Sequence, residues 1–218
     1  MVSQKIVERL SLYRRVLTQL RTEGETTIFS HQLAALVKCK APQVRRDVMQ
    51  LGYSGVPNTG YAIVQLLGSI SDFLDAPRSQ RAALVGVGHL GMAILAYFSG
   101  RWRRLSITAA FDNNPAKTGQ VIRGCRCYPV ADLGRVVQEQ GLALGVITVP
   151  APEAQSVADA LCQAGVKGLL NFAPVRLQIP EGIYIEDVDL TTAFEKVAYF
   201  ARQMETEPAS RLAVEDGA

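Results

Sequence analysis

The sequence predicts an α/β protein in which a doubly wound parallel sheet follows a smaller domain. The first observation is a turn in the middle of the chain, where the apolar run 82–85 leads into Gly86, Gly88 and Gly91 and then into the apolar segment 92–98. A strand, a glycine-rich turn and a helix in this order are typical of a dinucleotide-binding unit. The second observation is that strand and helix signals keep alternating beyond this turn. The third is that about 80 residues precede the turn, so a separate domain comes first.

Composition narrows the class of protein. The 218 residues are 48% hydrophobic and 20% charged, which is typical of one or two globular domains. No apolar run approaches the ~20 residues that cross a bilayer, and the first eight residues lack the apolar core of a signal peptide. We therefore expect a cytoplasmic protein with no membrane partner.

The cysteines do not predict a disulfide framework or a metal site. Four cysteines are scattered along the chain, and only two histidines, His31 and His89, could join the pair Cys125 and Cys127 as ligands. A tetrahedral zinc site needs four ligands close together, and no second cysteine pair is present. We expect reduced thiols and no metal.

The basic charge is concentrated in the first part of the chain. Up to residue 61, nine Lys and Arg oppose four Asp and Glu, a net charge of +5, whereas the rest of the chain carries fourteen and sixteen, a net charge of −2. A basic N-terminal part is expected if it meets a polyanion such as DNA.

Three helices are predicted in this basic part. Residues 3–21 have the spacing of an amphipathic helix, and Ser30 stands where the N-cap of a short helix over 31–37 is expected. Pro42 is tolerated in a first helical turn and opens a third helix over 43–51. A short turn between the second and third helices predicts a helix-turn-helix unit.

The segment 52–61 has turn residues every few positions and is interpreted as a small β wing. A helix over 62–74 and a linker over 75–80 complete an α+β winged-helix DNA-binding domain, which we assign to residues 1–77. The start of the third helix points into the major groove in such folds. We expect DNA contacts from Lys40, Gln43, Arg45, Arg46, Gly60 and Tyr61. From these residues alone, a helical oligomerisation module with a flexible linker is the alternative.

Residues 78–187 are predicted to form a Rossmann-like domain that binds NAD(H). A strand over 105–111 ends at Asp112, about 20 residues after the glycine turn, where such folds place the acid that holds the ribose hydroxyls. Asp112 repels a 2′-phosphate, and Asn113 and Asn114 supply no arginine to receive one, so NADH and NAD⁺ are favoured over the phosphorylated cofactors.

Later elements add the rest of the expected site. Helices over 131–140 and 153–164 alternate with strands over 144–149 and 168–172, and ligands lie beyond the carboxyl ends of such strands. The predicted cofactor-binding residues are Gly86, Val87, Gly88, His89, Leu90, Gly91, Asp112, Lys117, Thr148, Val149, Pro150, Asn171, Phe172, Ala173 and Pro174.

The domain has few residues that could catalyse hydride transfer to or from a bound dinucleotide. A dehydrogenase needs a proton donor or base near the nicotinamide, but His89 lies within the phosphate-binding turn and Tyr97 is expected on the helix that follows it. A sensor is therefore favoured over an enzyme, and we expect no catalytic residues. An NAD-dependent oxidoreductase with an N-terminal dimerisation domain remains the alternative, and coenzyme A remains a third candidate ligand.

The combination of motifs is more distinctive than the glycine turn alone. QVRRD at 43–47 closes the winged helix, Phe111 and Asp112 follow the glycine turn, and NFAPVRL at 171–177 precedes VDL at 188–190. This combination resembles the Rex family of redox-sensing transcriptional repressors from about residue 6 to residue 202.

The resemblance implies a homodimer that binds a palindromic double-stranded operator, senses the NADH/NAD⁺ ratio and is released from DNA by NADH. It implies that residues 188–204 hold a C-terminal helix, over 191–203, that is exchanged between subunits. The residues that would switch partners between the two states are Arg15, Tyr97, Asp189 and Leu190. We expect the tail over 205–218 to be disordered.

The sequence departs from the family in its DNA-reading region. The third helix continues with VMQL at 48–51, where relatives commonly carry a Ser-Tyr-Phe run, and the wing has VPNT at 56–59 where they tend to carry basic residues. Fewer cations in the wing predict fewer phosphate contacts and a shallower salt dependence of binding.

Overall fold

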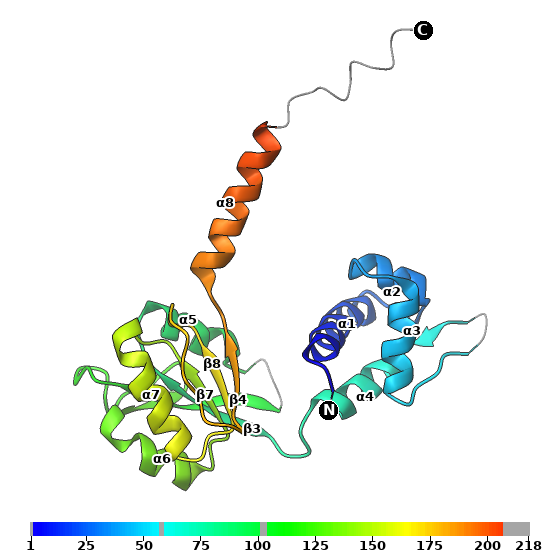
Figure 1. Cartoon of the computed structure of the whole chain (residues 1–218). Coiled ribbons are helices and arrows are strands. Elements are labelled where there is room, and N and C mark those ends of the chain that lie inside the picture. The colour runs from blue at the N-terminus through cyan, green and yellow to red at the C-terminus, as the bar shows by residue number, and fades with distance from the viewer. Residues whose placement is uncertain (1, 57–58, 101–103, 207–218) are drawn as a thin grey trace. The chain divides into compact units, whose positions relative to one another are not determined.

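The computed structural model describes residues 2–56, 59–100 and 104–206, with side chains to 204. The chain forms two compact units, Met1–Arg78 and Ser79–Ala218 (Figure 1). Pro57 and Asn58 of the wing, residues 101–103 and the tail beyond 206 lie outside the described residues, so what was predicted for the middle of the wing and for the tail stays a prediction.

The first unit consists of four helices and a two-stranded sheet. The elements are α1 (Gln4–Thr22), β1 (Thr27–Ile28), α2 (Ser30–Leu36), α3 (Ala41–Gln50), β2 (Tyr61–Ala62) and α4 (Ile63–Leu74). The apolar stripe of α1 is buried at Ile6, Leu10, Tyr13 and Leu17, as its periodicity predicts. These side chains join one core with residues of the other three helices.

The start of α2 differs from the prediction. Ser30 is the first helical residue, and the N-cap position belongs to Phe29. The side chain of Gln32 reaches back to accept the Phe29 backbone N–H at 2.8 Å, which supplies half of a capping box without a serine cap. The Ser30 hydroxyl is then free to accept a hydrogen bond from Arg45 at 3.1 Å.

The wing is short. The β2 strand pairs antiparallel with β1, and a single bridge joins Val56 to Gly60. Gly60 has φ of +81°, and a Cβ there would lie 2.6 Å from the carbonyl oxygen of Ile28. Only glycine can make this close return to β1.

The second unit is built on a seven-stranded sheet in the order β5-β6-β4-β3-β7-β8-β9, parallel apart from β5. Its strands are β3 (Gln80–Val85), β4 (Leu105–Asp112), β5 (Val121–Ile122), β6 (Cys125–Pro129), β7 (Leu144–Ile147), β8 (Gly168–Asn171) and β9 (Tyr184–Asp187). The strand order reverses between β3 and β7, as in a Rossmann fold. The predicted fold class is confirmed, although β5, β6 and β9 were not predicted from the sequence.

Helices cover both faces of this sheet. They are α5 (His89–Phe98), η1 (Val130–Asp132), α6 (Leu133–Gln140) and α7 (Ala151–Gln163). Alternate residues of β3 serve two cores, because Val85 packs under α6 and α7 whereas Leu84 packs under α5. Because β3 is buried on both faces over residues 82–85, these residues are apolar without interruption, as the run in the sequence predicts.

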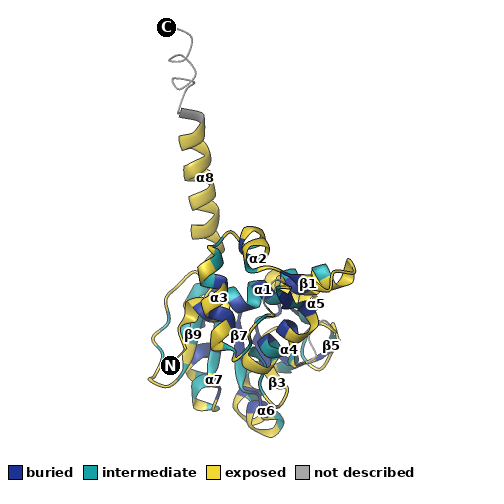
Figure 2. Ribbon diagram, turned by 90° about the vertical axis from the view of Figure 1, so that its right-hand side faces the viewer, coloured by how far each residue is buried: buried dark blue, intermediate teal, exposed yellow. Residues whose placement is uncertain are grey.

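The last helix, α8 (Leu190–Thr206), is exposed along its described side chains (Figure 2). Large apolar side chains are among them: Phe194 is 75% and Phe200 is 59% exposed. Among the described residues, no helix is long and apolar enough to cross a membrane.

Candidate nucleotide site and nucleic-acid interface

The glycine turn lies where the strand order reverses, which is where open α/β sheets bind ligands. Gly86 has φ of +97°, and a Cβ at Gly91 would lie only 2.1 Å from the Gly86 carbonyl oxygen. Thr148 at the end of β7 holds the turn by donating its hydroxyl to the carbonyl oxygens of Val85 at 3.0 Å and Gly86 at 2.7 Å.

Gly88 has a different reason to be glycine. Its φ is −77°, and a Cβ there would meet no atom within 4 Å, so the fold itself does not require glycine. Gly88 caps the N-terminus of α5 and lines the pocket, where the missing side chain leaves room for a ligand. Backbone N–H groups at such a helix start suit a pyrophosphate.

Asp112, the last residue of β4, is held by three donors. Its carboxylate accepts the backbone N–H groups of Val87 and Asn114, each at 2.8 Å, and the Lys117 ammonium group at 3.0 Å. Burial alone would raise the pKa of Asp112, but the bonds from Asn114, Lys117 and Val87 outweigh burial and hold the pKa below its usual value. The carboxylate is thus fixed in its charged, acceptor-only form, which suits ribose hydroxyls.

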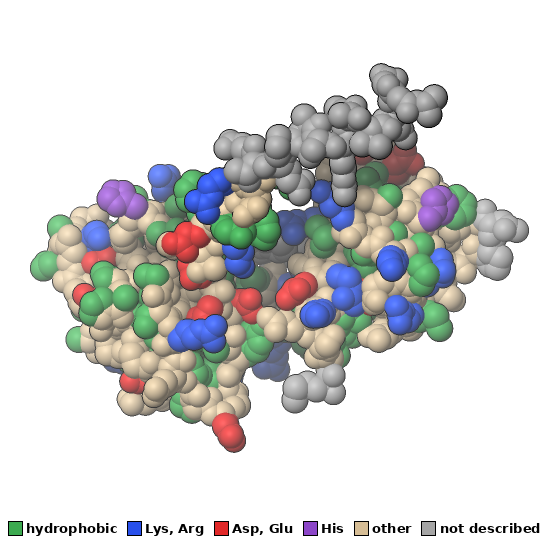
Figure 3. All heavy atoms as spheres, turned by 45° about the horizontal axis from the view of Figure 1, so that its top comes forward, with side chains coloured by type: hydrophobic (Ala, Val, Ile, Leu, Met, Phe, Trp, Pro, Cys, Tyr) green, Lys and Arg blue, Asp and Glu red, His purple; other side chains and the backbone are tan. Residues whose placement is uncertain are grey.

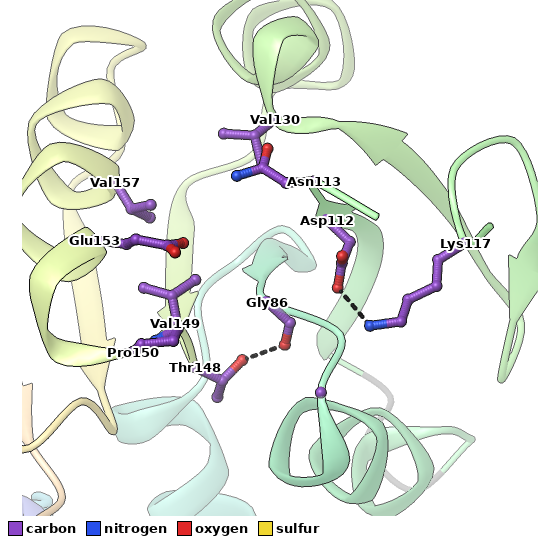
Figure 4. A pocket seen from close by; sticks show the side chains of 11 residues that line it. Gly86, Asp112, Asn113, Lys117, Val130, Thr148, Val149, Pro150, Glu153 and Val157 are labelled. Carbon is purple, nitrogen blue, oxygen red and sulfur yellow. Dashed lines mark hydrogen bonds and ion pairs between the residues drawn. The ribbon is translucent and has the colours of Figure 1, made fainter. Parts of the chain in front are cut away.

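These elements surround one cavity of about 270 Å³ (Figure 4). The lining residues are Gly86, Gly88, Asp112, Asn113, Lys117, Val130, Thr148, Val149, Pro150, Glu153 and Val157. Seven of them were among the predicted cofactor-binding residues. Asn113, Val130, Glu153 and Val157 were not, although Asn113 directly follows the β4 strand end and Glu153 lies in the first turn after β7.

Other predicted residues lie beside this cavity. Val87 contributes the backbone N–H that Asp112 accepts, and Gly91 lies beneath the turn. His89 and Leu90 are exposed at the start of α5 and are not part of the lining.

Asn171 is buried and organises the turn that follows β8. Its Nδ2 donates to the Val175 carbonyl oxygen and to the Asp187 carboxylate, both at 2.9 Å, and its Oδ1 accepts the Ala173 N–H at 3.0 Å. Pro174 and Ala173 line a second cavity of about 170 Å³ that also includes Asp189. Phe172 is half-buried under the α5 face of the sheet.

The candidate DNA interface lies around α3. Lys40, Arg45 and Arg46 are exposed there, and Lys and Arg side chains gather on one face of the right-hand body in Figure 3. Gln43 is half-buried instead: its amide donates to Asp47 at 2.8 Å, and its oxygen accepts from Arg46 at 3.1 Å.

Asp47 is the centre of a network that the sequence analysis missed. It is 1% exposed and accepts two hydrogen bonds from Arg9, at 2.6 and 2.7 Å, and one from the Tyr13 hydroxyl at 2.8 Å. Burial raises the pKa of Asp47, but the bonds from Arg9, Gln43 and Tyr13 outweigh it, so the pKa lies below its usual value. The spacing of apolar residues in α1 could have indicated that Arg9 lies beside the core. Its partner Asp47 is 38 residues further along the chain, so the pair itself leaves no local signal.

The prediction that Tyr61 faces DNA is corrected by its burial. Its side chain is 8% exposed in the core of the first unit, because β2 pairs with β1 and turns this residue inward. Burial also raises the pKa of Tyr61. Gly60 remains at the surface end of the wing, with its φ set by the return to Ile28.

The predicted switch residues come from separate elements. Arg15 is exposed on α1, and Tyr97 is 51% exposed on α5 with its ring 5.2 Å from that of Phe98. Asp189 caps α8, because its carboxylate accepts the Thr192 backbone N–H at 2.9 Å and the Thr192 hydroxyl. Leu190 is 57% exposed.

Comparison with known proteins agrees with this geometry. Proteins named redox-sensing transcriptional repressor Rex are 37% identical to this chain, in Roseiflexus sp. (strain RS-1) over 89% of both chains and in Brevibacillus brevis over 91% of this chain and 96% of the relative. The chain belongs to the Rex family of redox-sensing transcriptional repressors. This confirms the resemblance seen in the sequence, and the relatives are regulators, not enzymes.

Solved structures of the Rex family have the same fold. The repressor RSP in complex with β-NAD⁺ and operator DNA is 28% identical and superposes with a TM-score of 0.87 over 94% of both chains. RSP in complex with β-NADH is 27% identical, with a TM-score of 0.83 over 94% of this chain and 96% of RSP.

Two family models match separate parts of this Rex-family chain. One, described as "Putative DNA-binding protein N-terminus", matches residues 1–48, and the other, described as "CoA binding domain", matches residues 78–175. The first match falls on the helix-turn-helix unit, and the second falls on the Rossmann-like sheet.

Proposed function

We propose that this Rex-family chain is a homodimeric transcriptional repressor that binds a palindromic operator and is released from it by NADH. The observation that carries the proposal is the occurrence, in one chain, of the Asp112 pocket at the sheet reversal and a basic helix-turn-helix unit. The protein acts in the cytoplasm, where operator DNA is accessible.

The pocket favours a dinucleotide without a phosphate on the adenosine ribose. Asp112 binds the ribose hydroxyls, the N-terminus of α5 receives the pyrophosphate, and the only lysine of the lining, Lys117, is already bonded to Asp112. Glu153 adds a second carboxylate to the lining. NADH and NAD⁺ are therefore favoured over NADP(H), and over coenzyme A with its phosphorylated ribose.

Arg45, Arg46 and Lys40 supply the DNA contacts, with Gln43 holding Arg46 by a 3.1 Å hydrogen bond. Gly60 brings the backbone of the wing to the duplex. A dimer with two such units matches an operator with two half-sites. The exposed apolar side chains of α8 support exchange of this helix between subunits.

NADH is the releasing ligand because its nicotinamide ring is neutral, whereas the ring of NAD⁺ is charged. Leu190 and the turn 172–174 would form an apolar enclosure, and burying an unpaired charge is costly. Asp189 would change its hydrogen-bond partner between Tyr97 and Arg15 as the protein shifts between its DNA-binding and its released state. Moving that population from 1:99 to 99:1 requires NADH to prefer the released state by about 10⁴-fold.

The test is an anisotropy titration of the full chain on a Rex-type palindromic operator, at fixed salt, without ligand and then with NADH or NAD⁺. Tight binding that NADH abolishes and NAD⁺ largely spares is expected. Binding that is indifferent to both dinucleotides would refute NADH sensing, and absence of operator binding would refute the repressor assignment.

A further inference from the structure

The far end of the nucleotide pocket has a composition that suits a nucleobase. Beyond Asp112, the lining changes to the apolar side chains of Val130, Val149 and Val157. Apolar walls of this kind pack against the faces of an aromatic ring. At about 270 Å³, the cavity has room for one half of a dinucleotide, and Asp112 identifies that half as the adenosine.

One charged side chain enters this apolar end. Figure 4 shows the carboxylate of Glu153 pointing from the first turn of α7 into the pocket, on the side opposite Asp112 and Lys117. None of the described residues donates a hydrogen bond to this carboxylate. The backbone N–H of Glu153 donates to the Pro150 carbonyl oxygen at 3.0 Å, and its carbonyl oxygen accepts the Ser156 hydroxyl at 2.9 Å, so these bonds leave the carboxylate available. Glu153 is an exposed residue, so water satisfies its carboxylate in the ligand-free protein, and a donor on a ligand in the pocket can replace that water.

We propose that Glu153 is a specificity-determining residue that reads the nucleobase by accepting a hydrogen bond from the 6-amino group of adenine. This inference rests on the proposed NAD(H) site. An ionised carboxylate can only accept hydrogen bonds, so it pairs with an amino group and repels a carbonyl oxygen at the same position of the ring. The site therefore selects adenine over hypoxanthine, which carries an oxygen at that position.

Glu153 and Asp112 then divide the recognition of adenosine between them. Asp112 is fixed by three donors and binds free ribose hydroxyls, whereas Glu153 accepts from none of the described side chains and obtains its donor from the base. Asn113 lies between these two carboxylates along the lining (Figure 4).

The experiment compares NADH with reduced nicotinamide hypoxanthine dinucleotide, by calorimetric titration of the full-length protein. One hydrogen bond to a charged acceptor at a partly exposed site predicts that the wild type prefers NADH by about tenfold. Glu153→Ala should reduce the ratio of NADH affinity to hypoxanthine dinucleotide affinity to within about twofold. Glu153→Gln keeps an acceptor for adenine and adds a donor for the hypoxanthine oxygen, so it should also lower this affinity ratio. It should bind the hypoxanthine dinucleotide more tightly than Glu153→Ala does.

Glu181→Gln is the matched control, because Glu181 is an exposed carboxylate outside the pocket, and it should keep the wild-type ratio. Equal binding of both dinucleotides by the wild type, or a wild-type ratio in Glu153→Ala, would overturn the inference while leaving the NADH-sensing proposal intact. Failure of the wild type to bind either dinucleotide would overturn both.

Discussion

Replacing Asp47 by Asn should destabilise the first unit by about 3–4 kcal/mol. Four donor hydrogens from three side chains converge on this carboxylate, two from Arg9 and one each from Tyr13 and Gln43. An asparagine at this position offers one acceptor oxygen and turns an NH₂ group towards the remaining donors. The substitution changes the charge and the hydrogen bonding with almost no change in volume.

The magnitude follows from the exposure of each donor. Tyr13 is fully buried, so its hydroxyl cannot turn to water, and leaving it unpaired costs about 1–3 kcal/mol. The Arg9 side chain is 27% exposed and regains part of its hydration when its bonds to Asp47 are lost. That loss therefore costs less than the ~3 kcal/mol of a strong charge-assisted hydrogen bond. Gln43 is half-buried and adds least. Tyr13→Phe removes one bond alone and should cost about 1 kcal/mol.

Hydrogen exchange of the full-length protein, followed by mass spectrometry on peptides from α1 and α3, measures this loss where it occurs. The opening equilibrium should rise by about two to three orders of magnitude in Asp47→Asn, whereas the exposed Asp72→Asn on α4 should leave it unchanged. A change below about 1 kcal/mol in Asp47→Asn would refute the reasoning, because the three side chains would then be satisfied without the carboxylate.

The same contact sets a pH dependence with a definite sign. The pKa of Asp47 is lower in the folded protein than in the unfolded chain, so its contribution to stability is fully present above the ordinary carboxyl pKa. That contribution is lost as the pH falls through the folded pKa. The stability difference between wild type and Asp47→Asn should therefore shrink in acid, and a difference that stays constant down to the acid transition would contradict this account.

Four other substitutions test separate parts of the molecule. Gly91→Ala places a Cβ 2.1 Å from the Gly86 oxygen, so the turn must shift, and calorimetry should show NADH affinity reduced at least about tenfold; unchanged affinity would exclude a phosphate-binding turn. Asp112→Ala should weaken NADH by about tenfold or more through loss of the ribose acceptor, and an unaltered isotherm would remove that assignment. Arg45→Ala should abolish the operator shift with NADH affinity intact, whereas normal DNA binding would dismiss its role. Phe194, 75% exposed on α8, should be needed for assembly, so Phe194→Glu should elute with the mass of one chain in light scattering; a dimer mass would count against α8 as the interface.

Features that depend on nearby residues were predictable from the sequence. The glycine turn and Asp112 follow from the order of apolar runs and a fixed spacing, and the structure brings both into one pocket. The apolar stripe of α1 likewise predicts its buried face, because a helix repeats every 3.6 residues.

Features set by distant partners were not predictable in this way. Tyr61 is buried because β2 pairs with β1, some thirty residues earlier, and the buried Asp47 is compensated by two hydrogen bonds from Arg9, 38 residues earlier. The short strands β6 and β9 owe their conformation to pairing with β4 and β8. Such pairings leave no periodic signal in a segment of four or five residues.

The buried Asn171 has a mechanical consequence for α8. Its side chain joins the end of β8 to Asp187 at the end of β9, and its carbonyl oxygen accepts the Val188 N–H at 2.8 Å. The root of the helix is thereby anchored to the sheet, and the first point at which it can pivot is the Asp189 cap. With 17 residues, α8 is a lever about 25 Å long, so a rotation of about 10° at Asp189 moves its far end by about 4 Å. The partner change proposed for Asp189 would thus be amplified into a displacement as large as the spacing between packed side chains.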